Sequence, residues 1–138
     1  MEYLIGLAIF VSLFLYFAIE NNKNKKKLNN LFLGRESLTN EEFYEKYFKS
    51  NNTPDNIVYG VKRILEKELD TDLSKLQAED DFSTNLSVFF ALDSMADVEI
   101  VLSIEKEFNI IITDKEAEET HTIRDIINLI ERKIEQQA

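Results

Sequence analysis

The 138-residue sequence has no cysteine, one proline, three glycines and one histidine. The absence of cysteine excludes a disulfide framework and a thiolate metal site. A single histidine leaves zinc chemistry and Ser-His catalysis without their usual side chains. Scarce glycine and proline disfavour a turn-rich β architecture, whereas abundant Glu, Lys, Leu and Ile favour helices. The composition therefore predicts an all-α protein, not an enzyme, with no metal site.

The charge of the chain also limits which partners it can bind. The formal net charge is −10, and the basic residues gather near the start of the chain, at Lys23, Lys25, Lys26 and Lys27. The remaining sequence is strongly acidic. Such a surface repels nucleic acid and anionic lipid and suits partners that carry basic patches. We therefore expect no nucleic-acid binding.

The first segment is an uncharged apolar run from Tyr3 to Ile19. As a helix it would be about 25 Å long, slightly under the roughly 30 Å of a bilayer core. The acidic start at Glu2 and the lack of an A-x-A site oppose a cleaved signal peptide. Apolar residues on all sides oppose an amphipathic surface helix. We expect residues 1–20 to form a single transmembrane helix, with the lysines that follow it placing the C-terminal domain in the cytoplasm.

Changes in composition divide the chain between the first segment and residue 55 into two parts. Residues 21–38 are polar and basic and are expected to be a juxtamembrane linker. Residues 39–54 are expected to hold a short accessory helix and a second linker, because Thr39 and Glu42 have capping-box spacing. The pattern leaves open whether this helix packs on the domain or lies near the membrane.

Residues 55–138 are expected to form a small bundle of three main helices and one short helix. Helical periodicity predicts main helices over 55–69, 94–108 and 123–134, a single turn near 115–119, and a long loop over 70–92. Long loops in compact domains are usually functional. The residues expected to face inward are Ile57, Val61, Ile64, Leu65, Leu69, Met95, Val98, Val101, Leu102, Phe108, Ile126, Ile127, Ile130 and Ile134, with Leu73, Leu76, Phe82 and Leu86 as loop anchors.

Three segments of this region resemble one family. "DFSTNL" is similar to an F-x-x-D-L segment, with Asn85 where Asp is usual. "LDSMADVEIVLSIEKEF" is similar to a D-S-L-x-x-V-E-L run, with Met95 in the Leu position. "NIIITDKEAEETHTIRDIINLI" resembles I-P-D-E-E-A-E-x-x-T-T-V, with Thr113 in place of Pro. Taken in order and spacing, residues 55–134 resemble the acyl carrier protein family.

The resemblance implies that Ser94 receives 4′-phosphopantetheine from CoA, through a separate phosphopantetheinyl transferase that uses Mg²⁺. Asp93 would help to hold the metal and cofactor during transfer. The working thiol would arrive on the arm and carry acyl or aminoacyl groups as thioesters. Partner enzymes that load or transfer these groups, as in fatty acid or lipid biosynthesis, would read Met95, Asp97, Glu99 and Glu105. The chain as a whole would be a membrane-tethered carrier.

Other interpretations of these residues stay open at this point. Ser94 and Asp97 have near capping-box spacing, so the serine is a helix cap in the simplest reading. The family has two residues between the positions of Leu86 and Asp93, whereas this chain has the six residues 87–92. With that insertion, the domain is alternatively an unmodified docking scaffold. His121 is expected at the surface, and the run 79–81 lacks the spacing of a calcium loop.

Overall fold

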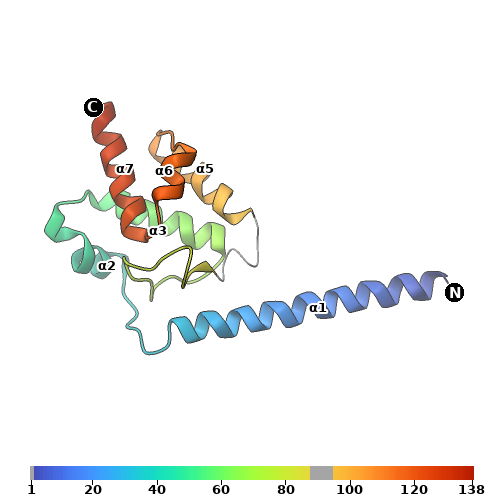
Figure 1. Ribbon diagram of the computed structural model, residues 1–138. Helices are drawn as coiled ribbons and strands as arrows, with labels where there is room; N and C mark the ends of the chain where they lie inside the picture. Colours follow the sequence, from blue (N-terminus) through green and yellow to red (C-terminus); the bar gives the residue numbers. More distant parts are fainter. Residues whose placement is uncertain (1, 88–94) are drawn as a thin grey trace. The chain divides into compact units, whose positions relative to one another are not determined.

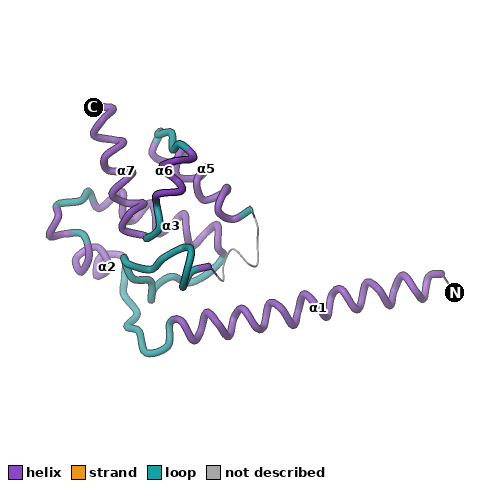
Figure 2. The backbone as a smooth tube through the Cα atoms, viewed as in Figure 1, coloured by secondary structure: helices purple, strands orange, loops and turns teal. Residues whose placement is uncertain are grey.

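The computed structural model describes residues 2–87 and 95–138, and the regular elements within these ranges are helices (Figures 1 and 2). The chain divides into two compact units, Met1–Leu33 and Gly34–Ala138. The first unit is a single helix, and the second unit is a bundle. The all-α bundle expected from the sequence is therefore present.

The first helix, α1 (Glu2–Leu31), corrects the prediction of a transmembrane segment. Within residues 2–87 and 95–138, no helix combines the length and the apolar character that crossing a membrane requires. The helix itself is long, but its apolar run ends at Ile19, short of the roughly 20 residues that a bilayer core needs. The transmembrane part of the predicted fold is therefore wrong, and so is the single-pass membrane localisation that depended on it.

α1 also continues further than the sequence suggested. It runs through residues 21–31, which were expected to be a linker. The segment contains neither glycine nor proline, and its lysines and leucines are good helix formers, so nothing in it stops the helix. Gly34 follows the end of α1 with φ of 75°, a left-handed conformation that glycine adopts without steric cost. The boundary between the two units falls at this glycine.

α2 (Asn40–Tyr47) starts at the capping box that the sequence predicts. Glu42 N donates to Thr39 Oγ1 at 3.2 Å, and Thr39 N donates to Glu42 Oε2 at 2.8 Å. Phe43 and Phe48 are fully buried, with ring centroids 5.8 Å apart. The short helix therefore packs on the bundle, which settles the choice left open by the sequence. A single 3-10 turn, η1 (Lys49–Asn51), follows.

α3 (Asp55–Leu69) is the central helix and contacts α2, α5 and α7. Its predicted bounds are confirmed, with Pro54 as the N-cap and Asp70 as a left-handed C-cap. Four of the five expected inward residues are buried, and Leu69 is half-buried. The close approach to α5 depends on a glycine, because a Cβ at Gly60 would lie 2.7 Å from Cζ of Phe108.

The loop after α3 has the anchors that the sequence predicts. Leu73, Leu76 and Leu86 are buried, and Phe82 is half-buried. Asp81 and Thr122 form an isolated antiparallel bridge, in which Phe82 N donates to the backbone oxygen of His121 at 2.9 Å. The middle of the loop is thus attached to the start of the last helix. His121 itself is exposed, as expected.

The rest of the bundle consists of α5 (Ala96–Phe108), α6 (Asp114–Glu119) and α7 (Ile123–Gln137), and of these α5 and α7 pack on α3 (Figure 1). Capping boxes at Thr113 and Thr122 start α6 and α7. On α7, Ile126 and Ile134 are half-buried. The fully or nearly fully buried residues of α7 are Ile123, Ile127, Leu129 and Ile130.

Candidate functional site

The predicted attachment residues come just before α5 in the sequence. Ser94 and Asp93 fall outside the described residues, as do Phe89 and Phe90 of the lengthened segment 87–92. The described chain continues at Met95, which is the N-cap of α5. The helix therefore begins at Ala96, two residues later than the sequence predicted. The first structural element after Ser94 is the N-terminal turn of a 13-residue helix.

This helix end has the electrostatics of an anion site. The first N–H groups of a helix lack partners within the helix, and the dipole makes this end positive. Asp97 Oδ1 accepts a hydrogen bond from Val98 N at 2.8 Å, and Glu99 N donates to the backbone oxygen of Met95 at 3.0 Å. Asp97 thus bonds within its own turn. A phosphate beside the end of α5 would be favoured by the dipole.

The predicted core face of α5 is only partly correct, because Val101 and Phe108 are half-buried but the other three residues are not. Met95, Val98 and Leu102 were expected to point inward, but they are 55%, 44% and 58% exposed. The buried residues are instead Ala96, Ile100 and Ile104. Both sets have helical spacing, so periodicity alone does not decide between them. The exposed set cannot serve as core packing in this arrangement.

The exposed face of α5 therefore combines apolar and acidic side chains. We call Met95, Asp97, Val98, Glu99 and Leu102 the exposed α5 face; all five are solvent-exposed. Monomeric proteins rarely expose clustered large apolar side chains without a partner. A surface of this kind suits a partner that has an apolar centre and basic groups around it.

Two other acids of α5 have structural contacts. Glu105, a predicted partner residue, is half-buried, and its Oε1 accepts from Ile112 N at 2.7 Å. That hydrogen bond fixes the connection between α5 and α6. Glu107 forms an ion pair with Arg63 of α3. Among the acids of α5, Asp97 and Glu99 are thus the two on the exposed face.

A buried ionic network was missed by reasoning from sequence. Asp80, which is almost fully buried, pairs with Arg35 through two hydrogen bonds and also accepts from Asn85. The only hint in the sequence is that Asn85 stands where the family usually has Asp. Among residues 2–87 and 95–138, no group of three or more His, Asp or Glu side chains is arranged to hold a metal ion.

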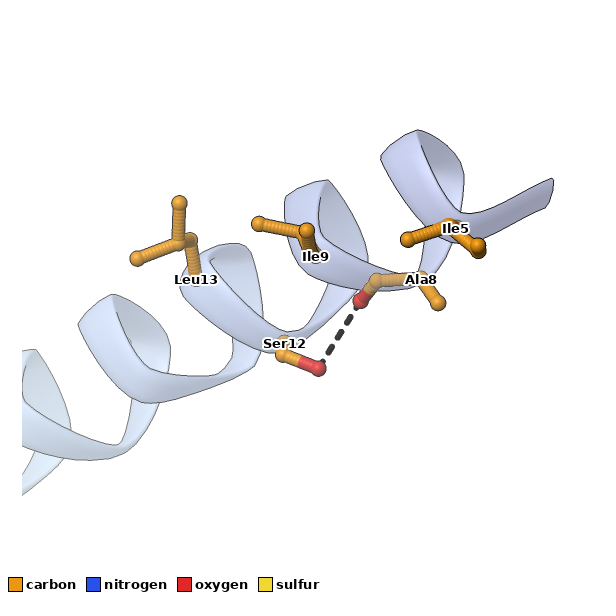
Figure 3. Close-up of a pocket in the computed structure, with 5 residues that line it drawn as sticks. All are labelled: Ile5, Ala8, Ile9, Ser12 and Leu13. Atoms are coloured by element: carbon orange, nitrogen blue, oxygen red, sulfur yellow. Dashed lines mark hydrogen bonds between the residues drawn. The ribbon is translucent and has the colours of Figure 1, made fainter. Parts of the chain in front are cut away.

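A shallow depression lies on α1 and is drawn in Figure 3. It is lined by Ile5, Ala8, Ile9, Ser12 and Leu13. Its one side-chain hydrogen bond in the figure runs from Ser12 Oγ to the backbone oxygen of Ala8, at 2.8 Å. This bond lies within a single helix. With no titratable group in its lining, the depression offers nothing to carrier chemistry.

The bundle agrees with the all-α arrangement that the sequence led us to expect of a carrier domain, the class of protein that presents a group to other enzymes. A family model described as "Phosphopantetheine attachment site" matches residues 60–130. The chain therefore belongs to the phosphopantetheine-binding family of acyl carrier proteins.

Curated relatives agree with this assignment. The chain is 33% identical over 78 residues to an acyl carrier protein of Thermosynechococcus vestitus, covering 56% of this chain and 91% of that protein. It is 38% identical over 72 residues to an acyl carrier protein of Phaeodactylum tricornutum, covering 52% of this chain and 90% of that protein. It is 36% identical over 73 residues to an acyl carrier protein of Bdellovibrio bacteriovorus, and the alignment covers 53% of this chain and 88% of that protein. The residues that the family model matches, 60–130, lie within the bundle.

Family membership gives the protein its cofactor and its general role. It carries acyl groups on covalently attached 4′-phosphopantetheine and is a carrier protein, not a catalytic enzyme. The described residues fit this group, because the helix end that follows the predicted serine is positively polarised and Met95 beside it is exposed. Phosphopantetheinyl transferases and acyl-handling enzymes are the general partners that follow from the family.

Proposed function

We propose that Ser94 is the residue that carries 4′-phosphopantetheine, and that Asp93 helps to hold the metal and cofactor during transfer. One observation carries the proposal: the Asp93-Ser94-Met95 triplet lies inside the matched region and directly precedes α5. Simple capping is a weaker account of the serine, because the N-cap of α5 is Met95.

The proposed transfer forms a bond between Ser94 Oγ and the phosphorus next to pantetheine in CoA. The phosphorus–oxygen bond to the adenosine bisphosphate half of CoA breaks, and the serine proton passes to a base on the transferase. This chain supplies a hydroxyl and a helix end that favours the phosphodiester anion. Because the chain has no cysteine, the thiol that holds acyl or aminoacyl thioesters is the one on the arm.

Partner enzymes would dock on the exposed α5 face. Met95 offers an apolar contact, and Asp97 and Glu99 offer charges that steer basic surfaces toward it. Glu105 would contribute less to docking, since its carboxylate already accepts from Ile112 N. In this proposal, residues 55–138 form the carrier domain, and residues 39–54 form an accessory helix packed on it.

Intact mass spectrometry of the full chain, after incubation with CoA, Mg²⁺ and a broad-specificity transferase, tests the attachment. We expect the mass increment of one phosphopantetheinyl group on the unsubstituted chain and on Ser87→Ala, a control at an exposed serine. Ser94→Ala should show no increment. An increment that persists in Ser94→Ala, or one that is missing from the unsubstituted chain, would contradict the assignment and favour an unmodified docking module.

A further inference from the structure

The helix α2 is an element that the family match does not include. It spans Asn40–Tyr47, whereas the match begins at residue 60. The helix packs on α3, and Phe43 within it and Phe48 at its end are fully buried. A cation lies against each of these rings: Lys62 of α3 against Phe43, and Arg124 of α7 against Phe48. The surroundings of the two cations therefore show how each end of α2 is held.

The ammonium group of Lys62 is buried without a polar partner. Lys62 is 1% exposed, and its Nζ lies 4.7 Å from the centroid of the Phe43 ring. In the part of the chain that the structure describes, no hydrogen bond or ion pair reaches this group. Burial lowers the pKa of Lys62 below 10.5, against the smaller opposing effects of Glu66 and Asp72. A buried charge without a partner costs free energy, and the aromatic ring offsets only part of that cost.

The guanidinium group of Arg124, by contrast, is fully paired. Its Cζ lies 5.0 Å from the centroid of the Phe48 ring, and its Nη1 donates to the backbone oxygen of Tyr47 at 2.9 Å. Arg124 also forms an ion pair with Glu79. The contacts with Phe48 and Tyr47 exist only while α2 is docked. Arg124 therefore stabilises the docked helix.

The two cations have opposite effects on any movement of α2 away from α3. Such a movement takes the Phe43 ring away from Lys62 and returns the ammonium group to water, which removes the cost of burial. It also breaks the hydrogen bond from Arg124 to Tyr47, which costs free energy. Because α2 has only eight residues and lies on the outside of α3, it can open without unfolding the rest of the bundle.

We propose that α2 is a cover that opens from the bundle on its own, with Lys62 favouring the open state and Arg124 the closed state. In the open state, the two aromatic rings, the ammonium group of Lys62 and the side of α3 beneath them are accessible to partners. The closed state, which the structure describes, hides the rings and the ammonium group. The device is independent of the modification of Ser94, since every group in it lies outside residues 88–94.

Amide hydrogen exchange of the full chain, followed by mass spectrometry at one pH and one temperature, tests whether α2 opens separately. The backbone amides of Phe43 and Phe48, each of which donates a hydrogen bond of 2.9 Å to the turn before it, report on α2. The amides of Ile64 and Leu65, two buried residues of α3, report on the bundle. In the unsubstituted chain, exchange in α2 should be at least about 10-fold faster than in α3.

Two substitutions should then change the exchange of α2 in opposite directions. Lys62→Met removes the buried charge and should slow exchange in α2 about fivefold. Arg124→Met removes the hydrogen bond to Tyr47 and should speed exchange in α2 about 10-fold. Lys106→Met, at an exposed lysine of α5, is the matched control and should leave the rate unchanged.

Three results would overturn the proposal. Equal exchange rates in α2 and α3 of the unsubstituted chain would mean that α2 opens only when the whole bundle unfolds. An unchanged or faster rate in Lys62→Met would show that the buried charge does not favour opening. An unchanged or slower rate in Arg124→Met would show that this side chain does not hold the helix. If either variant does not fold, Lys62→Leu and Arg124→Lys are measured against the same criteria.

Discussion

Replacing Lys62 by methionine removes a charge from the interior of the bundle while keeping most of the side-chain volume. Lys62 is 1% exposed, and its Nζ lies 4.7 Å from the centroid of the Phe43 ring. No hydrogen bond or ion pair to this ammonium group occurs among the described residues. The pKa of Lys62 is lowered from its ordinary value of 10.5 by burial, against the smaller opposing effects of Glu66 and Asp72.

Two opposing magnitudes decide the result of Lys62→Met. Replacing buried ionic groups by apolar side chains of similar volume often stabilises a protein by about 1–4 kcal/mol. The lost cation–π contact with Phe43 costs about 0.5–2 kcal/mol. We expect a net gain of about 1 kcal/mol in the free energy of unfolding near pH 7, which raises Tm by about 4–8 °C for a domain of this size.

Urea denaturation of the full chain at a series of pH values measures this gain and its cause. Between the lowered folded-state pKa and the unfolded value, the unfolded chain binds the extra proton, so stability rises with pH. The advantage of Lys62→Met should therefore be largest near neutral pH and shrink as the pH approaches 10.5. Lys106→Met, at an exposed lysine of α5, should show no such trend. A Lys62→Met variant that is less stable at pH 7, or an advantage independent of pH, would refute the reasoning.

Four further substitutions test other parts of the structure. The pKa of Glu116 is lowered to about 2 by hydrogen bonds from Lys133 and from Thr113, so its contribution to stability is present above 4.5 and disappears as the pH falls toward 2. Glu116→Gln should lower stability at neutral pH and weaken the loss of stability on acidification, followed by circular dichroism. An unchanged acid dependence would show that Glu116 does not contribute to stability. Thr122→Ala removes the α7 cap and should cost about 1 kcal/mol in urea denaturation, whereas a cost near zero would show that the cap is dispensable. Ile104→Ala should lower the free energy of unfolding by about 2–5 kcal/mol and Leu102→Ser by less than about 0.5 kcal/mol, since only Ile104 is buried. A larger loss for Leu102→Ser than for Ile104→Ala would mean that Leu102 faces the core, as the sequence analysis predicted.

Local signals in the sequence predicted local structure well. The bounds of α3 followed from apolar periodicity and from Pro54, and the box at Thr39 was visible from residue spacing. These features depend on neighbours within a few residues. The capping box at Thr113 was missed, although Glu116 stands at the required spacing.

Contacts between distant residues were not predictable in the same way. On α5, two apolar stripes have helical spacing, and only the packing against α3 decides that Ile104 and not Leu102 is buried. The pairing of Arg35 with Asp80 joins residues 45 positions apart and leaves no periodic signal. The predicted membrane span was wrong for a different reason. The apolar run is shorter than the roughly 20 residues that a bilayer core needs, and the prediction accepted it as long enough.

The burial of Phe43 and Phe48 has a practical consequence for exchanging this carrier with another. A chimaera joined at residue 60, where the family match starts, would cut α3 within its own length. One joined at residue 55 would discard both aromatic side chains and uncover the apolar surface on which they rest. Gly34 is the better splice point, because the unit that holds the bundle, Gly34–Ala138, begins there and is kept whole.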